Sequence, residues 1–264
     1  MKPHRHRGAA ALAATAVLAL CAALPAQAAP SAGPEADATR DPASFEVLVN
    51  AENPLDPLDY VPAQLTPAAG SQNLMVPEAA IALALLVEGA RLDGHALVVE
   101  SAYRSYERQA QVFRSYAARY GEAYASKISA RPGTSEHQLG LAADVGLAGG
   151  QCSLHRCFGD TAAGRWVAAH AVDYGFIIRY PEGAEDATGY AYEPWHLRFL
   201  GEGAAADFEA SGAASYEEYV AARTTPEPAP EPEPEPGADP APRNSIVPFL
   251  PGHTAPWDWR PRWH

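Results

Sequence analysis

The segment SEHQLGLAADV, residues 135–145, places polar side chains inside a short apolar run. Gly140 favours a turn, and the following stretch Ala142–Leu147, which is apolar except for Asp144, favours a β-strand. A buried carboxylate or imidazole needs a bonding partner, because burial of an unpaired polar group costs free energy. The segment therefore predicts a strand that carries Asp144 beside a turn that carries His137, with both side chains bound to a partner.

A second imidazole, His196, lies in the similar apolar context of YEPWHLRF, residues 192–199. Two imidazoles and one carboxylate are suitable ligands for a zinc ion that keeps one position open for water. Glu193, three residues before His196, could take a proton from that water without binding the metal itself. Taken singly, each residue also fits a structural role: His137 could cap a loop, Asp144 could bond backbone amides, and His196 could be a satisfied core histidine.

The apolar pattern around these segments predicts helices over residues 77–92, 106–120 and 161–174. It predicts further short strands at residues 96–100, 176–179 and 195–199. Ser215 and Glu218 form a possible capping box for a final helix. Because helices come first and short strands gather later, a parallel alternation of strands and helices is not indicated. We therefore expect an α+β fold, with helices packed on a small, mainly antiparallel sheet that carries the zinc site.

Four ordered stretches of the chain resemble the D-alanyl-D-alanine carboxypeptidases of the VanY type. This family belongs to a larger zinc peptidase group that also contains L,D-carboxypeptidases, D-Ala-D-Ala dipeptidases and the hedgehog signalling domain. The matching stretches are SAYRSYERQ (101–109), SARPGTSEHQLGLAADV (129–145), GFIIRYP (175–181) and TGYAYEPWHLRF (188–199). Together with the spacing between them, they cover most of residues 45–205.

The resemblance implies that zinc is held by His137, Asp144 and His196, with Glu193 as the catalytic base. Arg104 matches the family arginine that supports the oxyanion or binds the substrate carboxylate. A guanidinium suits the second role, because it can donate two parallel hydrogen bonds to a terminal carboxylate.

Two further residues, Gln109 and Ser135, fall on motif positions and are implied to contribute to the substrate cleft. Ala102 stands where many relatives have Gly, a small departure that leaves the assignment of the active site intact. The CSLHRC insert, residues 152–157, is less general, so the resemblance assigns it no function.

These residues and the resemblance together predict a secreted, zinc-dependent D-alanyl-D-alanine carboxypeptidase that trims the terminal D-alanine from peptidoglycan stem peptides. The same site also fits an L,D-carboxypeptidase or a D-Ala-D-Ala dipeptidase, because cleft walls that a single sequence does not resolve select the substrate. A zinc-bearing cell-wall binding module without catalysis is the alternative from another class. Glu193 argues against it, since a purely structural zinc site does not need an uncoordinated carboxylate three residues from a ligand.

The first 28 residues have the pattern of a secretory signal peptide. Three basic residues precede an apolar run over residues 9–24 and the small-residue sequence AQA at residues 26–28. The run is shorter than the roughly 20 residues that span a bilayer, so we expect cleavage after Ala28 and an extracytoplasmic protein without a stable membrane span. A membrane anchor is one alternative. Lipidation at Cys21 is another, which the leucine directly before that cysteine disfavours.

We expect the core-bearing carboxypeptidase domain to span residues 45–223. Residues 29–44 contain few apolar side chains and predict a flexible leader. Residues 224–264 predict an extended Pro/Glu-rich linker followed by a Trp-rich tail that is too short to fold alone. A disordered tail is favoured over one that docks on the domain or binds the cell wall.

Charge and cysteine content limit the partners and the compartment. Removal of the signal segment leaves 16 basic against 32 acidic residues, a net charge of −16, which excludes binding to nucleic acid phosphates. Cys152 and Cys157 are then an even pair in an exported chain and predict a disulfide. The resemblance implies peptidoglycan stem peptides as the partners, and we expect a monomer.

Overall fold

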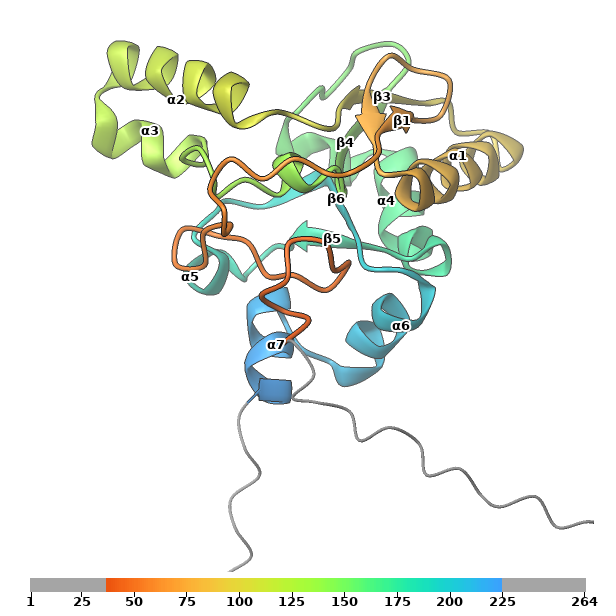
Figure 1. The fold of residues 1–264 in the computed structure, drawn as a ribbon. Coiled ribbons are helices and arrows are strands. Elements are labelled where there is room, and N and C mark those ends of the chain that lie inside the picture. Colours follow the sequence, from red (N-terminus) through yellow and green to blue (C-terminus); the bar gives the residue numbers. More distant parts are fainter. Residues whose placement is uncertain (1–36, 225–264) are drawn as a thin grey trace, which may run out of the picture. The chain divides into compact units, whose positions relative to one another are not determined.

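The computed structural model describes residues 37–224, in which helices pack around two antiparallel sheets (Figure 1). The expected signal peptide, the leader up to residue 36 and the expected tail from residue 225 lie outside the described residues. The main sheet has the strand order β3-β4-β6-β5, with every neighbouring pair antiparallel. Its strands are β3 (Leu97–Ser101), β4 (Ala142–Leu147), β5 (Phe176–Tyr180) and β6 (Glu193–Phe199). This arrangement confirms the α+β prediction.

The remaining elements of the described range are mainly helical. The α-helices are α1 (Pro77–Leu92), α2 (Tyr106–Tyr120), α3 (Glu122–Ile128), α4 (Ala162–His170), α5 (Glu185–Thr188), α6 (Glu202–Ser211) and α7 (Tyr216–Thr224). Three 3-10 turns are η1 (Glu136–Leu139), η2 (Arg156–Asp160) and η3 (Ala171–Tyr174). Strands β1 (Thr66–Pro67) and β2 (Leu74–Met75) form a small second sheet.

The ends of the helices follow from a few residues. Pro77 occupies the first turn of α1, where a missing N–H leaves no bond unmade. The Ser105 hydroxyl accepts a hydrogen bond from a first-turn amide of α2 and caps that helix. The helix expected over residues 161–174 is shorter than predicted, because α4 ends at His170. The chain then tightens into η3 and stops at Gly175, whose φ of 76° lies in the left-handed region.

The hydrophobic core lies between α1 and the main sheet. Leu83 of α1, Val145 of β4 and Leu197 of β6 are wholly buried in one cluster. A second cluster joins β5 to α6 and α7 and includes Ile177 and Tyr216. The first cluster also contains Val47 and Val49, near the start of the described range. Both ends of the described range therefore pack against the main sheet.

Strand register places polar side chains at one position of the main sheet. Asp144 on β4 is paired with His196 on β6 and, on its other side, with Ser101 at the end of β3. Because successive side chains of a strand point to opposite faces, Asp144 points away from the face that Val145 buries in the core. The sheet thus positions two of the expected metal ligands on its polar face.

The chain before β1 packs against the main sheet through Arg198. The guanidinium of Arg198 donates hydrogen bonds to the carbonyls of Phe45, at 2.8 Å, and Val47, at 2.7 Å. Residues 37–44, which we expected to belong to a flexible leader, directly precede Phe45 in the sequence and form hydrogen-bonded turns. Apolar content alone did not indicate these turns, since they are held by aspartate and serine side chains and by backbone groups.

The expected disulfide is present between Cys152 and Cys157, whose Cα atoms are 5.5 Å apart. It closes the loop between β4 and η2. In residues 37–224, no helix combines the length and the apolar character that crossing a membrane requires.

Candidate active site

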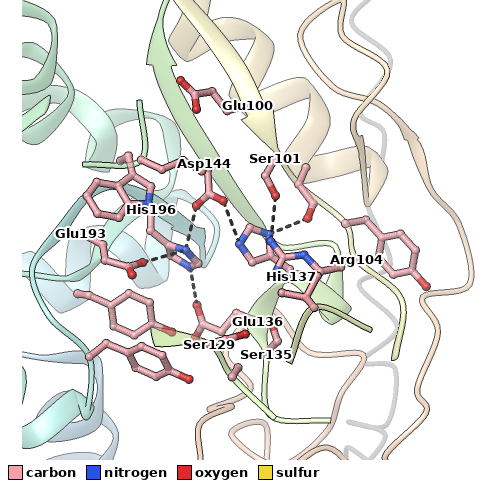
Figure 2. A pocket seen from close by; sticks show the side chains of 18 of the residues that line it. Glu100, Ser101, Arg104, Ser129, Ser135, Glu136, His137, Asp144, Glu193 and His196 are labelled. Atoms are coloured by element: carbon pink, nitrogen blue, oxygen red, sulfur yellow. Dashed lines mark hydrogen bonds and ion pairs between the residues drawn. The ribbon is translucent and has the colours of Figure 1, made fainter. Parts of the chain in front are cut away.

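A cleft of about 560 Å³ opens beside the centre of the main sheet. It is lined by most of the residues that the sequence singled out, namely Arg104, Ser135, His137, Asp144, Glu193 and His196 (Figure 2). These side chains come from the loop after β3, from η1 and the residue before it, and from strands β4 and β6. The fold therefore assembles one site from four separate parts of the chain.

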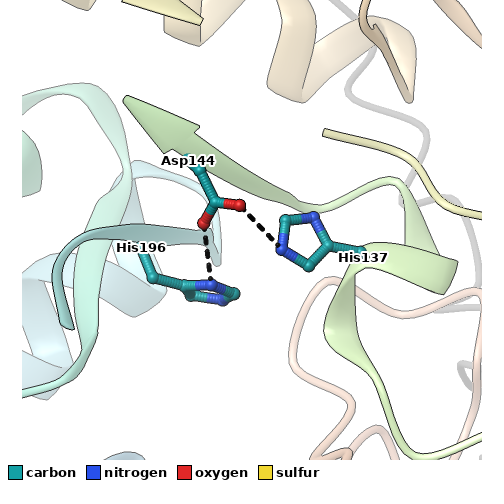
Figure 3. Close-up of side chains that lie close together, drawn as sticks. All are labelled: His137, Asp144 and His196. Atoms are coloured by element: carbon teal, nitrogen blue, oxygen red, sulfur yellow. Dashed lines mark ion pairs between the residues drawn. The ribbon is translucent and has the colours of Figure 1, made fainter. Parts of the chain in front are cut away.

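The His137, Asp144 and His196 side chains form a compact, buried group (Figure 3). Asp144 Oδ2 lies 3.3 Å from His137 Nε2, and Asp144 Oδ1 lies 3.1 Å from His196 Nδ1. One potential ligand atom from each residue falls within 4.8 Å of the others. The three residues proposed as metal ligands are thus brought together.

Neighbouring groups orient both imidazoles toward this group. His137 Nδ1 lies 2.6 Å from the carbonyl oxygen of Ala102, so this nitrogen carries the proton and Nε2 keeps its lone pair. His196 Nε2 lies 3.6 Å from Glu136 Oε2, which leaves Nδ1 as the nitrogen that faces Asp144. A hydrogen bond such as that between His137 and Ala102 fixes the tautomer and the ring direction of a metal-ligating histidine, and the Glu136 carboxylate favours a proton on the Nε2 of His196.

The donor set fits a divalent cation. Among the side chains of residues 37–224, Asp144 Oδ1, Glu136 Oε2 and His196 Nε2 are the buried atoms without a hydrogen-bond partner, and all three lie in this cluster. Burial opposes protonation of His196, yet the neighbouring Asp144 and Glu136 carboxylates raise its pKa to about 9. The cluster therefore favours positive charge, and two imidazole nitrogens with one carboxylate are ligands that suit zinc.

Glu193 lies at the start of β6 and outside the compact group. Its Oε2 is 3.8 Å from His196 Nδ1, and a quarter of its side chain (26%) is exposed to the cleft. Burial raises the pKa of Glu193 to about 7, an effect that His196 and Arg104 oppose and Asp144 reinforces. A carboxyl group with such a pKa can accept and return a proton near neutral pH.

Arg104 points into the same cleft from the loop after β3 (Figure 2). Its guanidinium donates to Gln109 Oε1, at 2.8 Å, and to Ser101 Oγ, at 3.2 Å. Burial lowers the pKa of Arg104, although Asp144 opposes the shift, and a guanidinium still stays charged at neutral pH. These two bonds leave guanidinium N–H groups that can bind an anionic part of a substrate.

Gln109 and Ser135 occupy different places relative to the cleft. Gln109 is wholly buried behind Arg104, and its amide nitrogen donates to the carbonyl of Ala130 at 2.6 Å. It therefore holds Arg104 in position and does not reach the cleft wall. Ser135 lines the cleft directly before η1.

The sequence interpretation missed a buried charge network behind His196. Glu136 Oε1 accepts hydrogen bonds from Arg179 Nε, at 2.7 Å, and from Arg198 Nη1, at 2.6 Å. Burial opposes its ionisation, yet these two guanidinium groups hold the pKa of Glu136 well below its usual range. Arg179 also forms a bidentate salt bridge with Glu217 on α7, in which Nη1 and Nη2 donate to the two carboxylate oxygens at 2.9 and 2.6 Å. Each of these arginines interrupts an apolar strand, which is the signal that would have identified them.

Two aromatic side chains on the cleft wall were also missed. The Tyr180 ring lies 4.9 Å from the His196 ring, and the Tyr190 ring lies 4.6 Å from that of Tyr180. Burial raises the pKa of Tyr190 to about 12, so its phenol stays protonated at neutral pH. This wall therefore adds a phenolic hydrogen-bond donor to the cleft.

Known proteins resemble the chain over its central part. The VanY family model, described as D-alanyl-D-alanine carboxypeptidase, matches residues 72–202. The putative carboxypeptidase YodJ of Bacillus subtilis is 48% identical over 128 residues, which are 48% of this chain and 47% of that protein. The bifunctional D-Ala-D-Ala dipeptidase and carboxypeptidase VanXYC of Enterococcus gallinarum is 36% identical over 157 residues, 58% of this chain and 82% of that protein. The chain thus spans about half the length of the Bacillus relative.

Solved structures agree with this match over about two thirds of the chain. The LdcB LD-carboxypeptidase superposes with a TM-score of 0.64 at 39% identity, covering 68% of this chain and 87% of that one. A variant of the vancomycin-resistance D,D-pentapeptidase VanY in complex with Zn(II) superposes with a TM-score of 0.57 at 33% identity, covering 67% and 98%. Motifs, site geometry and these similarities lead to one conclusion: the chain belongs to the VanY family of D-alanyl-D-alanine carboxypeptidases.

Proposed function

We propose that this chain is a secreted, zinc-dependent carboxypeptidase that removes the terminal D-alanine from peptidoglycan stem peptides. The observation that carries the proposal is the meeting of three kinds of group in one cleft. A buried His-Asp-His group, a carboxylate outside it and a guanidinium line the same space. The metal-dependent hydrolysis of a C-terminal peptide bond uses each of the three.

His137, Asp144 and His196 would hold the ion through Nε2, a carboxylate oxygen and Nδ1. When bound, zinc polarises the scissile carbonyl and lowers the pKa of a water molecule toward ~7. The Zn(II) complex of the similar VanY structure supports this choice of metal. A metal-free, purely structural role for the group would leave Asp144 Oδ1 buried without a hydrogen bond, with His196 Nδ1 at 3.1 Å as its ion-pair neighbour.

Glu193 would act as the general base and then as the general acid. Its carboxylate takes the proton of the attacking water, and the same group returns a proton to the amine of the departing D-alanine. Its position at the edge of the cluster allows it to reach the water while leaving the ligand positions to other residues. A zinc-bearing binding module without catalysis would have no use for such a carboxylate.

Arg104 would bind the terminal carboxylate of the substrate or the negative charge that develops at the scissile carbonyl. Because Gln109 and Ser101 already fix one edge of the guanidinium, it is preorganised for this contact. A free C-terminus is the feature that separates the substrate of a carboxypeptidase from internal peptide bonds.

The L,D-carboxypeptidase alternative has specific support. Two similar solved structures, LdcB and the DacB protein of Streptococcus pneumoniae, are named as L,D-carboxypeptidases. The relative from Enterococcus gallinarum is named as both a D-Ala-D-Ala dipeptidase and a carboxypeptidase, so a dipeptidase reaction is a further alternative. Three substrates distinguish the reactions: a pentapeptide stem, a tetrapeptide stem and the dipeptide D-Ala-D-Ala.

Mass spectrometry of these substrates after incubation with zinc-loaded protein tests the proposal. We expect the pentapeptide to lose one alanine, activity to disappear with a chelator and to return with zinc, and the Glu193→Ala protein to be inactive. Cleavage of the tetrapeptide alone would establish the L,D reaction. Absence of cleavage of all three substrates by the zinc-loaded protein would refute the peptidase function.

The proposed setting of the reaction is the cell wall, outside the cytoplasm. Peptidoglycan stem peptides are the proposed partners, and a monomer is the proposed state. The acidic net charge, −13 for the whole sequence, argues against binding to nucleic acid.

A further inference from the structure

The hairpin of α2 and α3 carries exposed aromatic side chains on its surface. Tyr116 and Tyr120 of α2 and Tyr124 of α3 are 38%, 50% and 54% exposed. The rings of Tyr116 and Tyr120 are 6.3 Å apart, and those of Tyr120 and Tyr124 are 5.6 Å apart. We call these three residues the tyrosine row. Contiguous exposed aromatic area of this kind is typical of a binding surface.

The tyrosine row continues the active-site cleft. Tyr116 lines that cleft together with Arg108 and Val112, which precede it on α2 at intervals of four residues. Residues four apart follow one another along a helix surface, so the ridge leads from the cleft to Tyr120. From α3, Ile128 also lines the cleft and is 43% exposed. In Figure 1, α2 and α3 extend away from the main sheet, so the ridge runs outward from the metal ligands.

The length of this ridge matches the length of a stem peptide. At 1.5 Å per residue, Tyr116 lies about 12 Å and Tyr120 about 18 Å along the helix from Arg108. In a pentapeptide stem that loses its last residue, four residues separate the scissile bond from the sugar that carries the peptide. Four extended residues span about 14 Å. The Arg104 guanidinium is bonded to Gln109, the residue after Arg108, and the five extended residues between a C-terminus held there and the sugar span about 17 Å. A stem that follows α2 would therefore bring its sugar to the level of Tyr116 and Tyr120.

We propose that the tyrosine row binds the amino sugar to which the stem peptide is attached. This inference rests on the proposed function, since it requires a peptidoglycan substrate in the cleft. A tyrosine ring offers an apolar face to the C–H groups of a sugar ring, and its hydroxyl can hydrogen-bond the sugar's polar substituents. The row would thus make the enzyme prefer stem peptides that are still joined to the glycan.

The hairpin does not need the tyrosine row in order to fold. Its interior is formed by other side chains, among them the buried Ala110, Phe113 and Ala125. The Arg131 guanidinium lies 4.9 Å from the centre of the Phe113 ring and covers it. Substitution of an exposed tyrosine can therefore test binding without removing the core of the hairpin.

Kinetics on a pair of matched substrates tests the inference. One substrate is the pentapeptide alone, and the other is the same pentapeptide joined to its disaccharide. We expect the wild-type KM to be about tenfold lower for the disaccharide-peptide, with similar kcat values. Tyr120→Ala should remove most of this advantage and leave the kinetics on the peptide alone unchanged. Tyr120→Phe, which keeps the ring, should retain most of it.

Leu92→Ala is the matched control, because Leu92 is a 70% exposed apolar residue on α1, outside the cleft lining. This variant should treat both substrates as the wild type does. Equal KM values of the wild-type protein for the two substrates would overturn the inference. So would an equal loss for Tyr120→Ala on both, which would place the row against the peptide.

A binding measurement separates failure of the proposed peptidase function from failure of the inference about the tyrosine row. If the wild-type protein cleaves neither substrate, calorimetric binding of the disaccharide-peptide to the Glu193→Ala protein still tests the tyrosine row. Weaker binding after the additional Tyr120→Ala change would support the row, and unchanged binding would refute it.

Discussion

Replacement of Glu136 by Gln should weaken both the fold and the metal site. The Glu136 carboxylate uses one oxygen for Arg179 and Arg198 and presents the other to His196 Nε2. A glutamine side chain has a single acceptor oxygen, and the two arginines require it. The amide NH2 of Gln at position 136 would then face His196 Nε2. That contact favours the imidazole tautomer with its proton on Nδ1, the nitrogen that we assign to the metal.

The size of both effects can be worked from the contacts. Removal of one partner from a buried ion pair costs about 3–5 kcal/mol. Arg179 keeps Glu217 and Arg198 keeps two backbone carbonyls, so we take the lower end, about 3 kcal/mol. For a domain of this size, that loss corresponds to a Tm about 6–12 °C lower. Loss of an orienting partner of a ligating histidine should weaken zinc binding by about 10–100-fold.

Thermal unfolding in chelator measures the first effect, and zinc competition titration of folded protein measures the second. Glu217→Gln is the matched control, because Glu217 binds Arg179 without contacting His196 and is 15% exposed. It should lower the Tm by less and leave zinc affinity unchanged. Wild-type zinc affinity in folded Glu136→Gln protein, or an equal loss of zinc affinity in both variants, would refute the role given to Glu136.

Further predictions concern the ligands, the base, the guanidinium and the domain limits. Alanine at any one of the three ligand positions should abolish stoichiometric zinc, measured by metal analysis; retention at wild-type affinity would remove that residue from the ligand set. Glu193→Ala should keep zinc and lose about 10²–10⁴-fold in kcat, and near-normal turnover would show that another group is the base. Arg104→Lys should lower kcat/KM about 10–100-fold on a free C-terminus and much less on its C-terminal amide, whereas equal discrimination in both proteins would exclude a carboxylate contact. A chain limited to residues 45–223 should fold, bind zinc and cleave short stem peptides; loss of activity with an intact circular dichroism spectrum would place the domain boundary elsewhere.

Periodicity in the sequence predicted the elements that carry their own end signals. Pro77 and Ser105 mark the starts of α1 and α2, and both helices lie where expected. The short helix α3 was missed because Ala125 is its one buried residue, so its sequence contains no repeat of apolar residues that face the core. The strand expected over residues 195–199 begins two residues earlier, so Glu193 is part of β6. Helix and strand limits set by tertiary contacts are not visible in local sequence.

The site shows the same difference between features that local sequence predicts and features that tertiary contacts set. Polar residues within apolar runs identified His137, Asp144 and His196, because an isolated buried charge needs a partner wherever it lies. That rule could not tell which partner each residue has, and Arg179 and Glu136 pair across 43 residues of sequence. Motif position suggested a cleft role for Gln109, whereas its burial behind Arg104 follows from packing between α2 and residues 129–130.

The buried network also has a consequence for the order in which the parts of the domain fold. Arg198 is bound by carbonyls more than 150 residues earlier in the chain, and Arg179 is bound by Glu217, which comes last among these groups in the sequence. Until α7 has formed, Arg179 is a charged group without its full complement of partners, and burial of the sheet beneath it is disfavoured. We therefore expect the orientation of His196 to be fixed late, after almost the whole domain has folded. Hydrolytic competence would then be acquired only when the folded protein is complete.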